Sequence, residues 1–254
     1  MTALAPAVPV TAPLAARDHA GLLDLQLRDR TPQQILAAAI RDLFPGRIAL
    51  VSSFGAEAAV LLHMVAGIDP ATPVLFLDTG KLFDETLAYR DALAARLGLT
   101  DLRVLRPDPA ALAARDDGGT LWFRDANACC YLRKVEPLER GLKGFAASIN
   151  GRKRFQAATR GSIPLVEADG ERLKFNPLAD WSPQQIEDYF RTHDLPRHPL
   201  VAQGYPSIGC APCTQPVAEG EDTRAGRWRG QDKTECGIHV SPLPLPGQIS
   251  TQDE

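Results

Sequence analysis

The sequence lacks long apolar runs, and it is poor in aromatic and sulfur-containing residues. Of its 254 residues, 6% are aromatic, five are Cys and two are Met. No stretch approaches the ~18 consecutive apolar residues of a membrane-spanning helix. The Ala/Pro-rich N-terminus also lacks the basic segment and solid apolar core of a signal peptide. We therefore expect no membrane contact and a reducing, cytoplasmic location, where cysteines serve metals or chemistry more often than disulfides.

An excess of positive charge is also missing. The formal net charge is −3, with 44% hydrophobic and 23% charged residues, which is typical of a globular protein and argues against nucleic acid as a partner. The length suits one α/β domain or two small ones. Composition predicts a flexible leader over 1–20, an α/β domain over 21–215, and a loop-rich, mobile C-terminal segment over 216–254.

Buried strands and amphipathic helices alternate along the chain, which predicts a Rossmann-like α/β fold with a mostly parallel sheet and right-handed crossovers. Apolar runs bounded by turn residues predict the strands, and helical periodicity with capping residues predicts the helices. The expected strands are 47–53, 73–80, 102–108 and 145–153, and the expected helices are 31–44, 56–68, 83–98 and one that begins near Ser182.

Small and polar residues follow the first two predicted strands. Ser52, Ser53, Phe54 and Gly55 end the first strand, and Leu77-Asp78-Thr79-Gly80 ends the second. Ligands bind beyond the carboxyl ends of strands in an open parallel sheet, so these loops indicate a nucleotide cleft. A plain turn is the alternative, and neither loop has the spacing of a Walker sequence.

A basic loop, 151–160, follows the fourth predicted strand. Because it lies at the same edge of the sheet, Arg152, Arg154 and Arg160 could contact phosphate or sulfate oxygens of a small anionic ligand. Most basic runs are solvated surface, which is the alternative here.

Four of the five cysteines form two close pairs. Cys129 and Cys130 are adjacent, and Cys210 and Cys213 form a C-x-x-C. Neighbouring cysteines cannot easily form a disulfide with each other, because their Cα atoms are too close. Four thiolates suit zinc or an iron–sulfur cluster, and an adjacent pair favours the bulkier cluster. Two unrelated buried pairs are the alternative.

The fifth cysteine, Cys236, lies in the polar stretch Lys-Thr-Glu-Cys-Gly-Ile-His (233–239). Such a position suits a nucleophile, with Lys233 or His239 favouring the thiolate. An incidental tail cysteine is the alternative.

Together, these features resemble the assimilatory sulfonucleotide reductases, and in particular the bacterial adenylyl-sulfate (APS) reductase branch, which is related to the phosphoadenylyl-sulfate (PAPS) reductases. The resemblance extends from about Arg47 to Val240. It rests on seven stretches that occur in the same order: 52–63, 77–91, 129–142, 176–182, 204–214, 220–228 and 235–239.

The resemblance implies an adenine nucleotide α-hydrolase-like fold and thioredoxin-dependent reduction of APS to sulfite and AMP, in sulfate assimilation for cysteine biosynthesis. The two cysteine pairs would hold a [4Fe–4S] cluster. Cys236 would attack the sulfur of APS and become a Cys-S-sulfonate, which thioredoxin or a glutaredoxin-like protein would cleave. The family also suggests a homo-oligomer, a dimer or tetramer.

The same resemblance implies the remaining site residues. Lys134 would link cluster and sulfate electrostatically, and positive charge would offset the repulsion between a thiolate and a sulfonate. The residues implied to bind substrate are Ser52, Ser53, Phe54, Gly55, Leu77, Thr79, Arg160, Arg224, Arg227 and His239.

Some positions depart from the family pattern. His198-Pro199-Leu200-Val201 stands where Asn-Pro-Leu-His is usual, Gln156-Ala157-Ala158 where a Gln-Ser pair is frequent, and Arg229 where a second aromatic often follows Trp228. These differences concern individual substrate contacts. The cysteine pairs favour APS, while PAPS or dual specificity is the alternative.

Two remoter alternatives are a cluster-dependent tRNA thiolation enzyme of the PP-loop type and a non-catalytic metal-binding regulator. The first requires an SGGxDS-like loop, whose second Gly and Asp-Ser the loop 52–58 lacks. The second leaves Cys236, Arg224 and Arg227 without a role.

Overall fold

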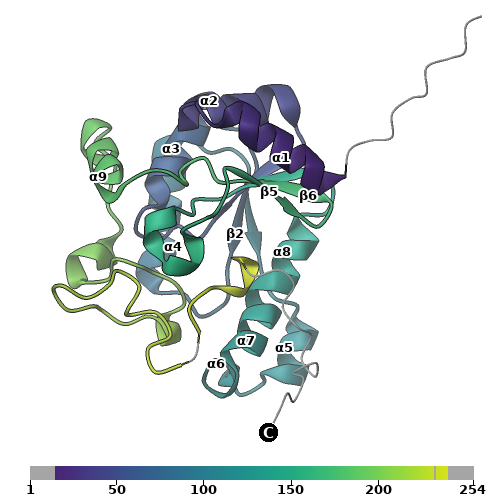
Figure 1. The fold of residues 1–254 in the computed structure, drawn as a ribbon. Coiled ribbons are helices and arrows are strands. Elements are labelled where there is room, and N and C mark those ends of the chain that lie inside the picture. The colour runs from purple at the N-terminus through teal and green to yellow at the C-terminus, as the bar shows by residue number, and fades with distance from the viewer. Residues whose placement is uncertain (1–14, 232, 240–254) are drawn as a thin grey trace, which may run out of the picture.

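The computed structural model describes residues 15–231 and 233–239, and it contains one six-stranded sheet in the order β3-β2-β1-β4-β6-β5 (Figure 1). Neighbouring strands are parallel from β3 to β6, and only β5 and β6 pair antiparallel. The mostly parallel sheet predicted from the sequence is therefore confirmed. The strands are β1 (Ile48–Ser52), β2 (Val74–Leu77), β3 (Leu102–Leu105), β4 (Ala147–Ile149), β5 (Val166–Asp169) and β6 (Arg172–Phe175).

Both faces of the central strands are covered, because alternate side chains of a strand point to opposite faces. Leu50 and Phe76 face the larger apolar core, whereas Ala49 and Leu75 face a smaller one. The larger core contains side chains of α1 (Ala16–Leu27), α2 (Pro32–Ala37), α3 (Ala58–Ile68), α4 (Asp84–Leu97) and α9 (Pro183–Thr192). The smaller core contains Leu138 of α8 (Glu136–Gly141), which thus covers the other face (Figure 1).

Two helices continue through π-helical turns. Residues Ala38–Leu43 extend α2, and residues Tyr131–Val135 join α7 (Ala126–Cys130) to α8 without a break. Two short helices, α5 (Pro109–Arg115) and α6 (Leu121–Arg124), precede this long helix. The π turn at 131–135 directly follows the adjacent cysteine pair, and it contains Lys134.

The structure corrects several predicted boundaries. Helix α1 begins at Ala16, so a flexible leader is wrong for residues 16–20, while residues 1–14 lie outside the described residues. The helix forms because Ala20, Leu23 and Leu27 bury one face against the sheet beside β5. The strands predicted at 73–80, 102–108 and 145–153 end earlier, at Leu77, Leu105 and Ile149. The hairpin of β5 and β6, which turns at Gly170 with φ 64°, was not predicted.

The described part of the C-terminal segment, 216–231 and 233–239, is loop-rich as predicted, with one 3-10 turn at Gly237–His239. This turn packs against the π turn 131–135, next to α7 and α8 (Figure 1). The division at residue 215 and the mobility of the segment stay predictions, and residues 240–254 lie outside the described residues. None of the helices in residues 15–231 and 233–239 has the length and apolar character that crossing a membrane requires.

Candidate active site

A cavity of about 680 Å³ lies where β1, β2 and β4 end, and it brings together most of the predicted substrate-binding residues. Ser52 and Leu77 are the last residues of their strands, and Asn150 directly follows β4. The cavity is thus at the carboxyl edge of the sheet, where ligands of parallel sheets bind. Among the predicted residues, those that line it are Ser52, Ser53, Gly55, Leu77, Lys134, Arg160, Arg224, Arg227, Cys236 and His239.

Phe54 and Thr79 are absent from this lining, which is defined by the described residues. Phe54 has φ 49°, and its buried ring packs edge-on against Phe76 at 5.5 Å between centroids. It therefore anchors the loop 52–55 to the sheet rather than facing a ligand. Thr79 is also buried, and its Oγ1 lies 3.3 Å from Sγ of Cys210, on the side of the cysteines.

The two cysteine pairs face one another. Cys129, Cys130, Cys210 and Cys213 all line a second, small cavity of about 10 Å³. Helix α7 presents the first pair at its C-terminal end, and a 3-10 turn with Pro212 presents the second. Burial, and next the proximity of Cys210, raise the pKa of Cys129 to about 11. All five cysteines are free thiols.

This donor set is made of sulfur alone, which is the chemistry of zinc and iron–sulfur sites. Within residues 15–231 and 233–239, no three His, Cys, Asp or Glu side chains are arranged to hold a single metal ion. Positive charge faces the four sulfurs, because the small cavity is also lined by Lys81, Arg133, Lys134 and Arg227. Four soft donors with cations around them fit an anionic iron–sulfur cluster.

Lys134 lines both cavities, as does Arg227, so it lies between the four cysteines and the large cavity. Burial alone would lower the pKa of its ammonium group. The sulfurs of Cys210, Cys236 and Cys130 more than offset this effect, so its pKa is above the ordinary value. Lys134 is therefore charged.

Cys236 is half-buried beside Lys134, and its sulfur faces the large cavity. The pKa of Cys236 lies well below the ordinary value, and the largest cause is a hydrogen bond from the Cys130 thiol. Lys134, the Ile238 N–H and Arg227 also lower this pKa, whereas burial raises it. The pKa of Cys130 is raised accordingly, first by this hydrogen bond and then by burial. Lys134, the Ile238 N–H and Arg227 favour the Cys236 thiolate also when Cys130 binds a cluster and has no proton to donate, so the arrangement presents a thiolate to the cavity.

The sequence suggested Lys233 or His239 as the group that favours this thiolate, whereas the structure gives that role to Cys130, Lys134 and Arg227. The ammonium group of Lys233 binds Oδ1 of Asn127 and lies 5.5 Å from the Trp228 ring centroid. Burial, and next Arg152 and Arg160, hold the pKa of His239 well below its ordinary value, so this imidazole is neutral.

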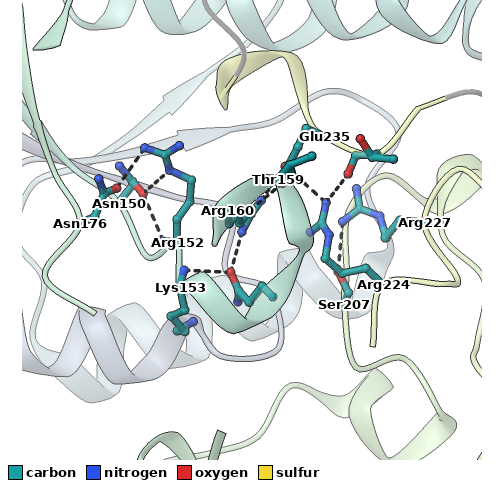
Figure 2. A network of polar contacts seen from close by, with 12 residues as sticks. Asn150, Arg152, Lys153, Thr159, Arg160, Asn176, Ser207, Arg224, Arg227 and Glu235 are labelled. Atoms are coloured by element: carbon teal, nitrogen blue, oxygen red, sulfur yellow. Dashed lines mark hydrogen bonds and ion pairs between the residues drawn. The ribbon is translucent and has the colours of Figure 1, made fainter. Parts of the chain in front are cut away.

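Two of the predicted substrate arginines already bind a carboxylate, that of Glu235 (Figure 2). Nε and Nη2 of Arg160 donate to Oε1 and Oε2 of Glu235 at 2.6 and 2.7 Å. Nη2 of Arg224 donates to the Thr234 carbonyl at 2.9 Å and lies 3.5 Å from Glu235 Oε2. Sequence reasoning did not single out Glu235, although it is the residue before Cys236.

Arg227 is fixed by packing rather than by an ion pair. Its guanidinium lies 4.4 Å from the Trp228 ring centroid, and Nη1 is 3.5 Å from Oγ of Ser207. A Cβ atom added to Gly209 would stand 2.3 Å from Nη2 of Arg227. Glycine at 209 therefore allows this cation to lie between the two cavities.

Among the basic residues of the loop 151–160, Arg152, Lys153 and Arg160 line the cavity, and Arg154 does not. Arg152 binds Asn150, Asn176 and Glu167, and it lines the cavity. Lys153 also lines it, and its Nζ lies 2.6 Å from Oε2 of Glu57.

Arg154, which the sequence grouped with Arg152 and Arg160, instead pairs with Asp180 and donates to the Ile163 carbonyl. Glu57 and Lys153 were missed by sequence reasoning. A carboxylate within an otherwise apolar helix start, 56–62, was the only available signal.

Among the residues that depart from the family pattern, Gln156 and Val201 line the cavity, whereas His198 and Arg229 do not. His198 is fully buried and binds Thr86 and the Leu200 N–H. Arg229 pairs with Glu221 at the surface. Gln156 accepts from Arg160 and donates to Glu57, which places it beside the cavity.

Comparison with known proteins gives consistent similarities. The model of the phosphoadenosine phosphosulfate reductase domain matches residues 47–216. An adenosine 5'-phosphosulfate reductase of Mesorhizobium japonicum is 58% identical over 214 residues, which are 84% of this chain and 84% of the relative. One of Mycobacterium tuberculosis is 46% identical, over 72% and 73% of the two chains. A phosphoadenosine 5'-phosphosulfate reductase of Gloeobacter violaceus is 45% identical, over 85% and 91%.

Solved structures give the same picture of the fold. A phosphoadenylyl-sulfate reductase of Candida auris, in complex with phosphate, has a TM-score of 0.67 and 28% identity, and it covers 79% of this chain and 97% of its own. An FMN adenylyltransferase of Candida glabrata has a TM-score of 0.52 and 13% identity over 91% and 88% of the chains, which is a likeness of fold alone.

Proposed function

The chain belongs to the phosphoadenosine phosphosulfate reductase family, and from this premise we propose that it reduces adenosine 5'-phosphosulfate to sulfite and AMP, as an oxidoreductase that acts on sulfur. The observation that carries the proposal is the Cys236 thiolate, which faces a cavity of nucleotide size between Lys134 and Arg227. Relatives that share most of the sequence bear the name of this activity.

The reaction has two steps. In the first, the Cys236 thiolate attacks the sulfur of the phosphosulfate, a bond forms between the two sulfurs, and the S–O bond breaks so that AMP leaves with its electron pair. A thiolate and a sulfonate repel each other, and the cations Lys134 and Arg227 offset that repulsion in the transition state. AMP is a stabilised leaving group, so the step requires no strong general acid.

In the second step, a thiol of an external dithiol protein attacks the Cys236 sulfur, which releases sulfite. The attack leaves a mixed disulfide between the reductant and Cys236, which the second thiol of the reductant cleaves. Cys236 returns to a thiolate, and the reductant, oxidised to a disulfide, supplies the two electrons. Thioredoxin or a glutaredoxin-like protein fits this role. Cys236 is half-buried, so residues 233–239 must move to present it to a partner.

We propose that Cys129, Cys130, Cys210 and Cys213 hold a [4Fe–4S] cluster. The proposal is supported by the sulfur-only donor set and by the four cations that line the same small cavity. When bound, the cluster would supply an electrostatic field at the sulfonate rather than electrons for turnover. Lys134 lies between the two sites and is the residue through which that field would act.

The proposed substrate is APS rather than PAPS, although one relative bears the name of a PAPS reductase. Arg152, Lys153 and Arg160 of the cavity each already pair with a carboxylate. An additional 3′-phosphate that bound one of these three cations would therefore have to displace its carboxylate partner. APS, which lacks that phosphate, requires fewer of these exchanges.

Three further features are proposals that rest on sequence reasoning. These are a homo-oligomer, a cytoplasmic location consistent with five free thiols, and a mobile C-terminal segment. The tRNA-thiolation and regulator alternatives have no support among the named relatives.

The test is the intact mass of anaerobically purified protein after incubation with APS or with PAPS, without thioredoxin. We expect one sulfonate adduct, mapped to Cys236 and lost on addition of reduced thioredoxin. The Cys236→Ser variant is the matched control, and it should form no adduct. If neither nucleotide yields an adduct in protein that carries its iron and sulfide, the proposed mechanism is wrong.

A further inference from the structure

Glu235 directly precedes the nucleophile, and its carboxylate binds Arg160 and Arg224, two arginines that line the cavity. Its side chain is 11% exposed, and that of its partner Arg160 is 8% exposed. Thr159 also donates to it, at 3.1 Å. A carboxylate that is held by two arginines and a hydroxyl resembles an oxyanion bound in the same site.

The contact uses the part of Arg160 best suited to an oxyanion. The Nε/Nη2 edge of a guanidinium binds two oxygens at once, and both of these atoms donate to Glu235. The third nitrogen, Nη1, donates to Oε1 of Gln156 at 2.5 Å. A phosphate or sulfonate that takes the same edge of Arg160 must therefore replace the Glu235 carboxylate.

Glu235 and Cys236 are consecutive residues, so the carboxylate cannot leave Arg160 without affecting the position of the thiol. Residues 233–239 contact the remainder of the protein at few polar points. These include Lys233 with Asn127, the Thr234 carbonyl with Arg224, and Glu235 with Arg160. The Arg160–Glu235 pair is bidentate and almost fully buried, so it is the strongest of the three.

We propose that Glu235 is a positioning residue: its carboxylate occupies the anion site of Arg160 when no substrate is bound, holds residues 233–239 over the cavity, and competes with the substrate anion for that arginine. Binding of an oxyanion thereby loosens the segment that carries Cys236. The identity of the anion as a phosphosulfate rests on the proposed function, whereas the competition itself does not.

The test is the Glu235→Gln variant, with inorganic sulfate and AMP as probes in calorimetric titrations of the anaerobic holoenzyme. Loss of the competing charge should tighten sulfate and AMP binding by roughly tenfold, the effect of one favourable charged contact. A residue with a merely structural role would leave anion affinity unchanged or weaken it. Unchanged or weaker binding by folded Glu235→Gln would overturn the proposal.

A second readout is the rate at which iodoacetamide alkylates Cys236, followed by peptide mass. In the wild type, sulfate should accelerate alkylation because it releases the segment. In Glu235→Gln, alkylation should already be fast and no longer respond to sulfate. An equal response of both proteins to sulfate would contradict the coupling.

Two further variants make the test specific. Glu139→Gln breaks another arginine–carboxylate pair, in which Nη2 of Arg172 donates to both oxygens of Glu139 outside the cavity, and it should change neither readout. Glu235→Asp retains the charge and should bind sulfate like the wild type, so it serves if the Gln variant does not fold. Sulfate binding requires no reductase activity. Failure of the sulfonate adduct to form would therefore overturn the proposed function and leave the competition standing.

Discussion

The hydroxyl oxygen of Thr79 lies 3.3 Å from Sγ of Cys210, so the loop after the second strand contacts the second cysteine pair directly. The backbone carbonyl of Thr79 accepts a hydrogen bond from Nη1 of Arg133 at 2.8 Å, and Arg133 pairs with Asp116 at 2.6 Å. One polar chain thus connects the sheet, the helix that follows Cys130 and the loop that carries Cys210. The position of the four cysteines depends on this chain.

Removal of the Asp116 charge should destabilise the fold strongly. The Asp116→Asn change leaves Arg133 buried without its anion, because their side chains are 0% and 8% exposed. Breaking a buried pair costs about 3–5 kcal/mol. The free energy of unfolding in urea measures the effect. Asp101→Asn, which breaks the more exposed pair with Arg103, should cost about 1 kcal/mol or less. Similar losses for the two variants would show that burial does not govern the pair.

The Gly209→Ala change should impair activity more than stability. The added Cβ would stand 2.3 Å from Nη2 and 2.6 Å from Cζ of Arg227, so this cation must leave its position between the two cavities. We expect the rate of sulfite formation to fall by about tenfold or more, as displaced catalytic groups commonly cause. In Gly21→Ala, where no atom lies within 4 Å of the new Cβ, the rate should be unchanged. A fully active Gly209→Ala enzyme would mean that Arg227 is not required at this position.

Loss of the Lys134 charge should slow the first chemical step. Lys134 is a half-buried cation beside Cys236, so the Lys134→Gln variant has less positive charge to offset the approach of thiolate and sulfonate. Removal of one such stabilising group costs about 10²–10³ in rate. The measurement is a single turnover with APS, followed by the mass of the adduct. Lys143→Gln, an exposed lysine on the same stretch of chain, is the control and should react at the wild-type rate.

Acid should destabilise the protein through His198. Burial lowers the pKa of this imidazole from 6.5 to about 4. Its Nδ1 accepts the Leu200 N–H, so Nε2 carries the proton and donates to Thr86. Between pH 6.5 and about 4 the unfolded chain binds a proton that the folded protein does not, so stability falls as the pH is lowered through this range, by roughly 3 kcal/mol at its acid end.

The measurement compares the free energy of unfolding of the wild type and of His198→Gln across that pH range. The variant has no group that titrates at this position, so its stability should decline less steeply towards acid. Parallel curves for the two proteins would assign the acid sensitivity to other residues.

The sequence was sufficient to predict the centre of the fold, because the central strands are short apolar runs that end in small or polar residues. Val74–Leu77 is buried on both faces, a pattern that few other structures produce. The ends of the strands were less predictable. The fourth strand was expected to continue to residue 153 but ends at Ile149. After that point the side chain of Asn150 binds the backbone N–H and Nε of Arg152 instead.

The candidate site likewise contains features that the sequence predicts and features that only the folded structure shows. Adjacent cysteines and a C-x-x-C are local features, so the sequence displays them directly. Which arginine of the basic loop faces the cavity does not follow from the local sequence. Arg154 differs from Arg160 because Asp180, 26 residues away, binds it outside the cavity. Glu235 was missed for a similar reason, since its partner Arg160 is 75 residues distant and only the folded chain brings the two together.

The π turn that follows Cys130 determines how the side chains of α8 are rotated about the helix axis relative to the two cysteines of α7. A π turn holds one residue more than the regular spacing, and it is common at functional sites. Deletion of one residue between Tyr131 and Val135 would let the helix continue in ordinary α form, and it would rotate the following side chains by about 100° relative to the cysteines. The lysine that now lies between the sulfurs and the cavity would then point elsewhere. The extra residue of this π turn therefore determines the direction in which Lys134 points.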